Sequence, residues 1–240
     1  MAVLSAVIMN QLKQVSVATV TTALYKRGFR NQMIQDVYPV GAGKKERLIG
    51  PAYTLRYMPA REDLNKLEVF RDREHPQRKA VEECPPGYVL VMDSRKDARA
   101  ASAGGILVTR LQQRGVAGVI TDGGFRDSME IASLTMPAYH HRPSSPTNLT
   151  HHQAIDINVP IGCGDAPVFP GDIIFGDEEG VVVIPAHVVE ELAEEAVQMT
   201  AFEDFVTEKV KEGRSILGLY PATDPKTLDD FAVWRKANNR

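Results

Sequence analysis

The sequence predicts a single α/β domain built around a mixed β-sheet, and three observations indicate this fold class. Apolar, strand-like segments alternate along the chain with amphipathic, helical ones. The last two strand-like segments, 173–177 and 181–185, are separated only by a Glu-Glu-Gly turn, which favours an antiparallel hairpin. The 240 residues contain no internal repeat and no low-complexity tract, which fits one large domain.

The composition is that of an ordinary soluble globular protein, with 43% hydrophobic residues, 25% charged residues and a formal net charge of -3. Charges of both signs are interspersed, so we expect no nucleic-acid and no membrane partner. No apolar run approaches the roughly 20 residues of a membrane span, and the first residues do not have the pattern of a signal peptide. Cys84 and Cys163 stand far apart and outside any CxxC motif, which fits a reducing, cytoplasmic location.

The first half of the chain is expected to begin with helices. Ser16 or Thr19 is a suitable N-cap for the second helix, and Gly28 is a suitable stop. The elements predicted before residue 100 are helices at 3–13 and 16–28, a loop-rich segment at 29–50, and strands at 51–57 and 88–93.

The segment 59–83 is strongly charged and predicts an exposed loop and helix, with Pro76 as the boundary. We interpret its charges as a solvated face. Arg56 and Arg61 are the cations expected to be able to reach a neighbouring site.

The stretch 104–127 organises the centre of the chain. A helix is predicted over 106–114, Gly115 ends it, and the apolar run 116–121 predicts a buried strand. This strand delivers the polar cluster 122–127, Asp-Gly-Gly-Phe-Arg-Asp. Polar residues at the end of a buried strand are well placed to bind ligands.

The second half of the chain ends in a long helix and an extension. The elements predicted here are a helix to Leu134, strands at 137–140 and 155–161, a loop between them, a turn at 170–172, the hairpin, and a helix at 186–212. We expect residues 1–212 to form the domain. Residues 213–240, with Tyr220 and Trp234, are expected to pack on the domain or on a neighbouring subunit.

Gly104-Gly105 opens the central helix and predicts an anion site. The backbone N–H groups of Gly105, Ile106 and Leu107 are unpaired at a helix start, so they can face a small anion. A dinucleotide site is disfavoured, because the third glycine of GxGxxG is missing and no acid follows a second strand about 20 residues later. An ordinary helix start is the alternative.

Arg126, Asp127 and Glu130 are the candidate catalytic residues. Arginine binds carboxylates through two parallel hydrogen bonds. Asp127 is a ligand type that Mg²⁺ prefers, and Glu130 shares its face if a helix starts there. The alternative is that Asp127 caps this helix with Glu130 as its capping-box partner.

Two pairs of adjacent histidines, His140-His141 and His151-His152, are weak candidates for zinc. Neighbouring residues on a strand point to opposite faces, so each pair offers one ligand. His140 or His141 remains a candidate for proton transfer.

The central stretch resembles the RraA-like family (regulator of ribonuclease activity A), which includes the 4-hydroxy-4-methyl-2-oxoglutarate aldolases. The resemblance extends over about residues 10–200. It is carried by Gly104-Gly105-Ile106-Leu107, 114–119, 122–127, 137–139 and 170–185. Residues 59–83 and 213–240 extend beyond the compact members.

This resemblance implies an αββα sandwich assembled as trimers or hexamers, with the site between subunits. It implies Mg²⁺ (or Mn²⁺) on Asp127, with Arg126 on the 2-oxo acid and the backbone of 104–107 on its carboxylate. The aldolases carry an acid twenty residues before Arg-Asp, where this chain has Gly105. We hypothesise that Glu130 supplies the missing carboxylate as a second metal ligand.

The expected function is that of a divalent-metal-dependent, class II aldolase-like lyase. It would act on a small hydroxylated 2-oxo acid through a metal-stabilised enolate, by aldol cleavage that releases pyruvate. One alternative is a dehydratase or hydratase of a 3-deoxy-2-oxo sugar acid at the same site. Another is a non-catalytic regulator that binds a ribonuclease or another protein. The candidate proton carriers are a water positioned by Glu130, or His140 or His141.

Overall fold

A nine-stranded mixed sheet forms the centre of the protein. The structure, a computed structural model, describes residues 4–41 and 46–240. Its parallel strands are β3 (Leu48–Pro59), β4 (Val89–Asp93), β6 (Gly118–Thr121) and β8 (Ala138–His140). Its antiparallel strands are β1 (Met33–Ile34), β2 (Tyr38–Pro39), β10 (His152–Ile157), β13 (Ile173–Asp177) and β14 (Gly180–Ile184). The predicted mixed sheet and its late hairpin are confirmed.

The long strand β3 belongs to both halves of the sheet, which lie in separate layers. Ile174 and Val183 of the hairpin share a core cluster with Val89 and Val91 of β4, so the two halves pack face to face. Phe175 lies on the other face of the hairpin, since successive residues of a strand point to opposite sides.

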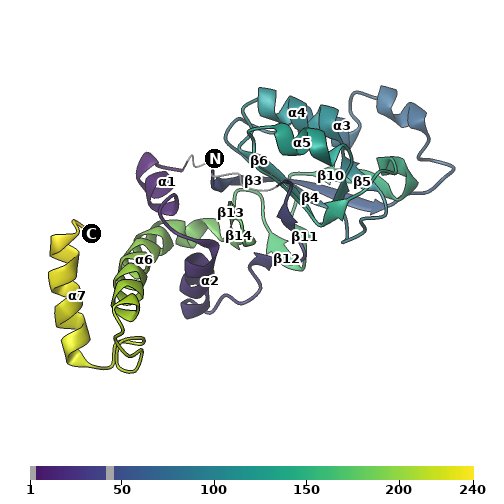
Figure 1. The fold of residues 1–240 in the computed structure, drawn as a ribbon. Coiled ribbons are helices and arrows are strands. Elements are labelled where there is room, and N and C mark those ends of the chain that lie inside the picture. The colour runs from purple at the N-terminus through teal and green to yellow at the C-terminus, as the bar shows by residue number, and fades with distance from the viewer. Residues whose placement is uncertain (1–3, 42–45) are drawn as a thin grey trace.

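Helices cover both outer faces and complete an αββα arrangement. One face carries α1 (Ala6–Leu12), α2 (Val17–Lys26) and α6 (Val189–Lys211), and the other carries α3 (Pro76–Glu83), α4 (Gly105–Gln113) and α5 (Ser128–Ser133). Figure 1 shows α3, α4 and α5 gathered on one side of the sheet. Among the described helices, none combines the length and the apolar character needed to cross a membrane.

The sequence patterns did not predict several short elements. A three-stranded parallel sheet consists of β5 (Ala101–Ala103), β7 (Gly124–Phe125) and β9 (Arg142–Pro143). A two-stranded antiparallel sheet consists of β11 (Ile161–Cys163) and β12 (Ala166–Val168). Short 3-10 helices are η1 (Leu67–Arg71), η2 (Asn148–Thr150) and η3 (Ala186–Val188). Strands of two or three residues are too short to show a period, so their pairing depends on tertiary contacts.

Most element boundaries agree with the sequence, with two differences. Ser16 caps α2, because its side chain accepts a hydrogen bond from the backbone N–H of Thr19, and Gly28 follows the helix with a φ of 86°. The strand expected over 155–161 is wrong: β10 ends at Ile157, and the left-handed backbone of Asn158 (φ 56°) separates it from β11. The loop-rich segment 29–50 contains β1, β2 and the start of β3.

The C-terminal residues form a separate helical hairpin with the end of α6. Helix α7 (Pro225–Ala237) runs beside α6, away from the body of the sheet (Figure 1). Phe205 and Leu219 are fully buried between the two helices, and Phe231 and Trp234 of α7 pack against them.

Gly50 lies in β3 where no side chain fits. A Cβ there would lie 2.5 Å from the Gly87 carbonyl oxygen and 3.2 Å from Cγ2 of Val89. We expect Gly50→Ala to lower the free energy of unfolding by about 1–3 kcal/mol, because neighbouring backbone must move. The matched control is Gly162→Ala, which has open space around its Cβ and should change stability by less than about 0.5 kcal/mol. Urea denaturation measures both, and equal effects would contradict the packing argument.

Candidate functional site

The candidate site is a half-open cavity of about 230 Å³ beside the start of α4. It is lined by β5, the start of α4, the segment after β7, and residues from η1, α3 and η2. The lining residues are Phe70, Gln77, Arg78, Ala101, Ala103, Gly104, Ile106, Leu107, Arg126, Asp127, Thr147 and Asn148. Segments far apart in the sequence therefore meet here.

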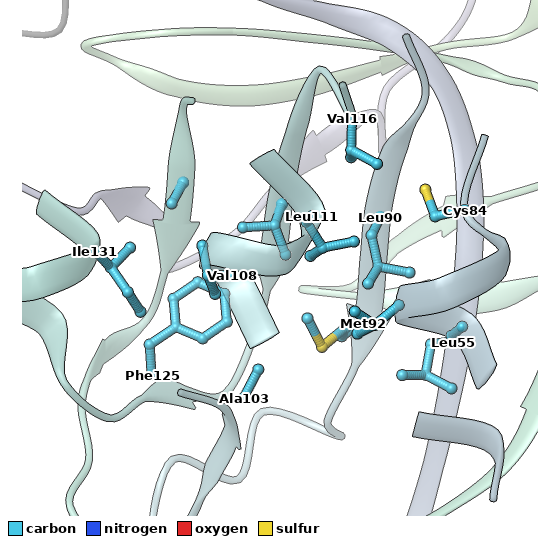
Figure 2. Packing of buried hydrophobic residues seen from close by; sticks show 14 of the residues in the cluster. Leu55, Cys84, Leu90, Met92, Ala103, Val108, Leu111, Val116, Phe125 and Ile131 are labelled. Carbon is cyan, nitrogen blue, oxygen red and sulfur yellow. The ribbon is translucent and has the colours of Figure 1, made fainter. Parts of the chain in front are cut away.

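Phe125 positions the Arg-Asp pair. Its ring is fully buried and belongs to the same core cluster as Val108 of α4 and Ile131 of α5. Figure 2 shows the three side chains directed toward one another. The backbone N–H of the next residue, Arg126, donates to the Ala103 carbonyl at 3.1 Å, so the chain after Phe125 is held against β5.

Asp127 faces the start of α4. Its backbone is left-handed (φ 57°), and its Oδ2 accepts a hydrogen bond from the Gly105 N–H at 3.1 Å. The Arg126 Nε lies 3.6 Å from the same oxygen. The capping-box alternative is wrong, because the Asp127 side chain makes no capping hydrogen bond to α5. Its carboxylate caps α4 instead, where Gly104 has no side chain to do so.

The Glu130 side chain reaches the same helix start, at Gly105, from α5. A Cβ on Gly105 would lie 2.8 Å from Glu130 Oε2 and 3.6 Å from Asp127 Oδ2, so both carboxylate oxygens converge on this glycine. The Glu130 carboxylate has no ion pair with any described residue. Glycine at position 105 therefore leaves room for an acid delivered by the neighbouring helix.

The donor atoms at this point suit a hard divalent cation. Two carboxylates with waters are the ligand set that Mg²⁺ prefers. Within residues 4–41 and 46–240, no group of three or more His, Cys, Asp or Glu side chains is close enough to hold a metal, so a closed, zinc-like site is absent from this part of the chain. The histidine pairs therefore form no such cluster.

The backbone N–H groups at the helix start are partly used. The Gly105 N–H donates to Asp127, and the Leu107 N–H donates to the Gly104 carbonyl at 3.1 Å. The Ile106 N–H has no hydrogen-bond partner among the residues that the structure describes. Of the three predicted anion donors, Ile106 is the one left for a ligand.

Arg78, which the sequence did not single out, lies in the cavity in place of Arg56 and Arg61. Arg56 pairs with Asp156, and Arg61 is an exposed residue that pairs with its neighbour Asp63. The expectation that these two arginines reach the site is wrong for this cavity, because neither lines it.

The charged segment 59–83, expected to be a solvated face, also contributes residues to the cavity wall. Arg78 lines the cavity with its guanidinium over the Phe70 ring, 4.4 Å from the centroid, and burial lowers its pKa from the ordinary value. The helical spacing that buries Gln77, Ala80 and Val81 was the available signal.

Asp122 directly follows β6 and precedes β7, whereas Asp127 follows β7. It is buried and accepts hydrogen bonds from the backbone N–H groups of Ser94, Lys96 and Gly164. Burial raises its pKa to about 6, against the effect of these donors. It does not line the cavity, so its part is to join the loops that contain Ser94, Lys96 and Gly164.

His140 and His141 do not line the cavity. His140 is buried, stacks on Phe125 at 5.7 Å, and has its pKa lowered to about 4 by that burial. It is therefore neutral near pH 7. His141 Nδ1 lies 2.8 Å from the Asp36 carbonyl oxygen. The Glu130 carboxylate does not line the cavity either, but its Oε2 approaches the same glycine as the Asp127 carboxylate, which favours Glu130 over both histidines.

Comparison with known proteins gives consistent matches. The RraA-like family model, described as Aldolase/RraA, matches residues 17–183. The chain is 31% identical over 165 residues to a provisionally named 4-hydroxy-4-methyl-2-oxoglutarate aldolase of Halalkalibacterium halodurans, covering 67% of this chain and 70% of that protein. It is 27% identical to the 4-hydroxy-4-methyl-2-oxoglutarate aldolase of Thermus thermophilus, covering 65% and 92%.

A solved structure agrees with the sequence relatives. Streptomyces coelicolor RraAS2, described as an unusual member of the RNase ES inhibitor RraA protein family, is similar with a TM-score of 0.74 and 26% identity, covering 85% of this chain and 98% of that one. The family model covers more than half of the chain, including the whole stretch from Gly104 to Asp127. The protein therefore belongs to the RraA-like family.

Proposed function

We propose that the protein is a divalent-metal-dependent lyase that cleaves a small hydroxylated 2-oxo acid and releases pyruvate. The observation that carries this proposal is the convergence of the Asp127 and Glu130 carboxylates on Gly105, beside Arg126 at a cavity. The aldolase names of sequence relatives support the same class of reaction.

Arg126 and the start of α4 bind the substrate. The guanidinium of Arg126 holds the substrate carboxylate or its 2-oxo oxygen, and the free N–H of Ile106 donates to the same group. A Cβ on Gly104 would lie 2.6 Å from Cγ of Arg126, so glycine is required for the arginine to lie across the helix start. These contacts orient the carbon chain of the substrate into the cavity.

Asp127 and Glu130 hold the cation, Mg²⁺ or Mn²⁺. When bound, it supplies Lewis-acid polarisation of the 2-oxo group. The positive charge of Arg126 acts on the same oxygen as negative charge develops there. The hydrogen bond from the Gly105 N–H already holds the Asp127 carboxylate in place. This carboxylate therefore need not reorganise when the cation binds.

Glu130 moves the proton in this scheme. A water positioned by the Glu130 carboxylate carries away the proton of the 4-hydroxyl group as the bond between C3 and C4 breaks. The electron pair of that bond forms a double bond between C2 and C3, and the 2-oxo oxygen takes up the negative charge. The products of this step are the enolate of pyruvate and an aldehyde or ketone. Return of the proton to C3 gives pyruvate, and atoms and charge balance.

The rim of the cavity favours a homo-oligomer. Ile106 and Met129 flank the site with 86% and 90% of their surface exposed. Contact with a neighbouring subunit would remove the apolar surface of both side chains from water. We propose a trimer or a hexamer whose neighbouring subunit covers this rim.

The proposal is tested with the purified protein, Mg²⁺ or Mn²⁺, and a panel of 4-hydroxy-2-oxo and 3-deoxy-2-oxo acids. We expect pyruvate to be released, and EDTA to reduce the rate to background. An ultraviolet-absorbing product without pyruvate would indicate the dehydratase alternative at the same site. The RNase inhibitor family of RraAS2 favours the regulator as the rival class. No turnover on the panel, together with stable binding of a ribonuclease, would support the regulator and end the lyase proposal.

A further inference from the structure

The carboxamides of Gln77 and Asn148 form an unexplained pair in the cavity wall. Gln77 comes from α3 and Asn148 from η2, and they are only 2% and 6% exposed. Both line the cavity that contains Arg126 and Asp127. Polar side chains at such burial normally have all their hydrogen-bonding atoms paired.

Hydrogen bonds to β5 determine how both carboxamides are oriented. Gln77 Nε2 donates to the Ser102 carbonyl at 2.6 Å, and Asn148 Nδ2 donates to the carbonyls of Ala101 at 3.2 Å and Ser102 at 3.4 Å. A carbonyl oxygen only accepts, so each amide nitrogen must face the strand. The amide oxygens consequently face away from β5.

Both of these oxygens lack a donor. Oε1 of Gln77 and Oδ1 of Asn148 are buried and have no hydrogen-bond partner among the described residues. An unmade hydrogen bond to a buried acceptor costs roughly 1–3 kcal/mol. Since neither oxygen has accessible surface in this conformation, the two side chains must shift slightly toward the cavity for a bound molecule to supply the donors.

Arg78 adds donors to the same wall. It follows Gln77 in α3, its guanidinium lies over Phe70, and it forms no ion pair within the described part of the chain. The wall therefore offers acceptors and donors side by side. A hydroxyl group matches this arrangement because it donates one hydrogen bond and accepts others, whereas a carboxylate only accepts and would face the two amide oxygens.

We propose that Gln77 and Asn148 determine specificity by accepting hydrogen bonds from hydroxyl groups of the substrate. The substrate of the site is then a polyhydroxylated 2-oxo acid of the 3-deoxy-2-oxo sugar acid class. Arg126 binds its carboxyl end and Arg78 donates to its distal hydroxyls. This inference rests on the proposed lyase function and narrows its substrate to a monocarboxylate.

The test compares 3-deoxy-2-oxogluconate with the dicarboxylate 4-hydroxy-4-methyl-2-oxoglutarate. We expect a higher kcat/KM for the sugar acid in the wild-type protein. Gln77→Met and Asn148→Leu should each lower kcat/KM for the sugar acid by about 10- to 100-fold, mainly by raising KM, because each leaves a substrate hydroxyl without its acceptor. Inhibition by oxalate, which has no hydroxyl group and binds at the Arg126 end, should be unchanged in both variants. The matched control is Gln113→Met, an exposed residue of α4 outside the cavity.

Two results would overturn the specificity assignment while the lyase proposal stands. One is a wild-type preference for the dicarboxylate that Arg78→Gln abolishes. The other is an equal loss for both substrates, together with weaker oxalate inhibition, in Gln77→Met and Asn148→Leu. If the wild-type protein turns over neither substrate and oxalate does not bind with Mg²⁺ present, the lyase proposal fails and the specificity assignment falls with it.

Discussion

Asp127→Asn is expected to reduce turnover by about 10³-fold while the protein remains folded. The substitution removes the negative charge that holds the cation, and that charge is worth several kcal/mol in the transition state. Asparagine keeps a side-chain oxygen that can accept from the Gly105 N–H, as Asp127 does at 3.1 Å. It also tolerates the left-handed backbone at this position (φ 57°), which alanine would not. The variant therefore separates the charge of Asp127 from its structural role.

Turnover, Mn²⁺ affinity by calorimetry and the melting temperature measure these effects separately. We expect the first two to fall sharply and the third to change by a few degrees at most. The matched control is Asp229→Asn, an exposed residue of α7 far along the chain from the cavity, which should leave all three unchanged. Full activity in Asp127→Asn would remove Asp127 from the metal site.

Moving the carboxylate from position 130 to position 105 is expected to restore most of the turnover that each single substitution removes. Glu130→Ala should lower turnover by about 10- to 100-fold, since it removes one of two carboxylates at the candidate metal site. Gly105→Asp alone should also be impaired, because its Cβ would lie 2.8 Å from Glu130 Oε2 and a third carboxylate would crowd the site. The double variant Gly105→Asp/Glu130→Ala relieves that contact and supplies the acid from the first turn of α4, so turnover should recover to within about tenfold of the wild type.

The recovery distinguishes a shared role from two independent losses. Independent losses would multiply in the double variant, whereas residues that exchange one function are non-additive. Glu194→Gln, an exposed residue of α6, serves as the control for removal of a surface carboxylate. If Glu130→Ala keeps both its Mn²⁺ affinity and its turnover, Glu130 does not replace the acid of the aldolases.

The regular elements of the fold were predictable because their patterns are local. The run Val89–Asp93 is almost wholly buried, and the hairpin of β13 and β14 forms with the expected turn. Ser16 caps α2 through its own side chain, three residues from its partner. Each of these depends on a few neighbouring residues, so the sequence alone contains the information.

The irregular part of the fold depends on distant contacts. Strands β5, β7 and β9 have two or three residues each and exist only because they pair with one another across forty residues. The break at Asn158 interrupts an alternation that otherwise continues. The alternation alone predicts a strand that continues through Asn158, because it contains no information about where the partner strand ends.

For the site, residue types and spacing along Gly104–Asp127 indicated an anion-binding turn and an Arg-Asp pair, and the family resemblance implied an acid at the position of Gly105. Tertiary packing decided which side chains face that turn. Asp122 and Asp127 come from the same short cluster, yet one is buried under backbone donors and the other lines the cavity. Likewise Arg78, Gln77 and Asn148 reach the cavity only because α3 and η2 pack against β5. Local sequence sets which elements form, while the direction of a side chain depends on partners that lie far away along the chain.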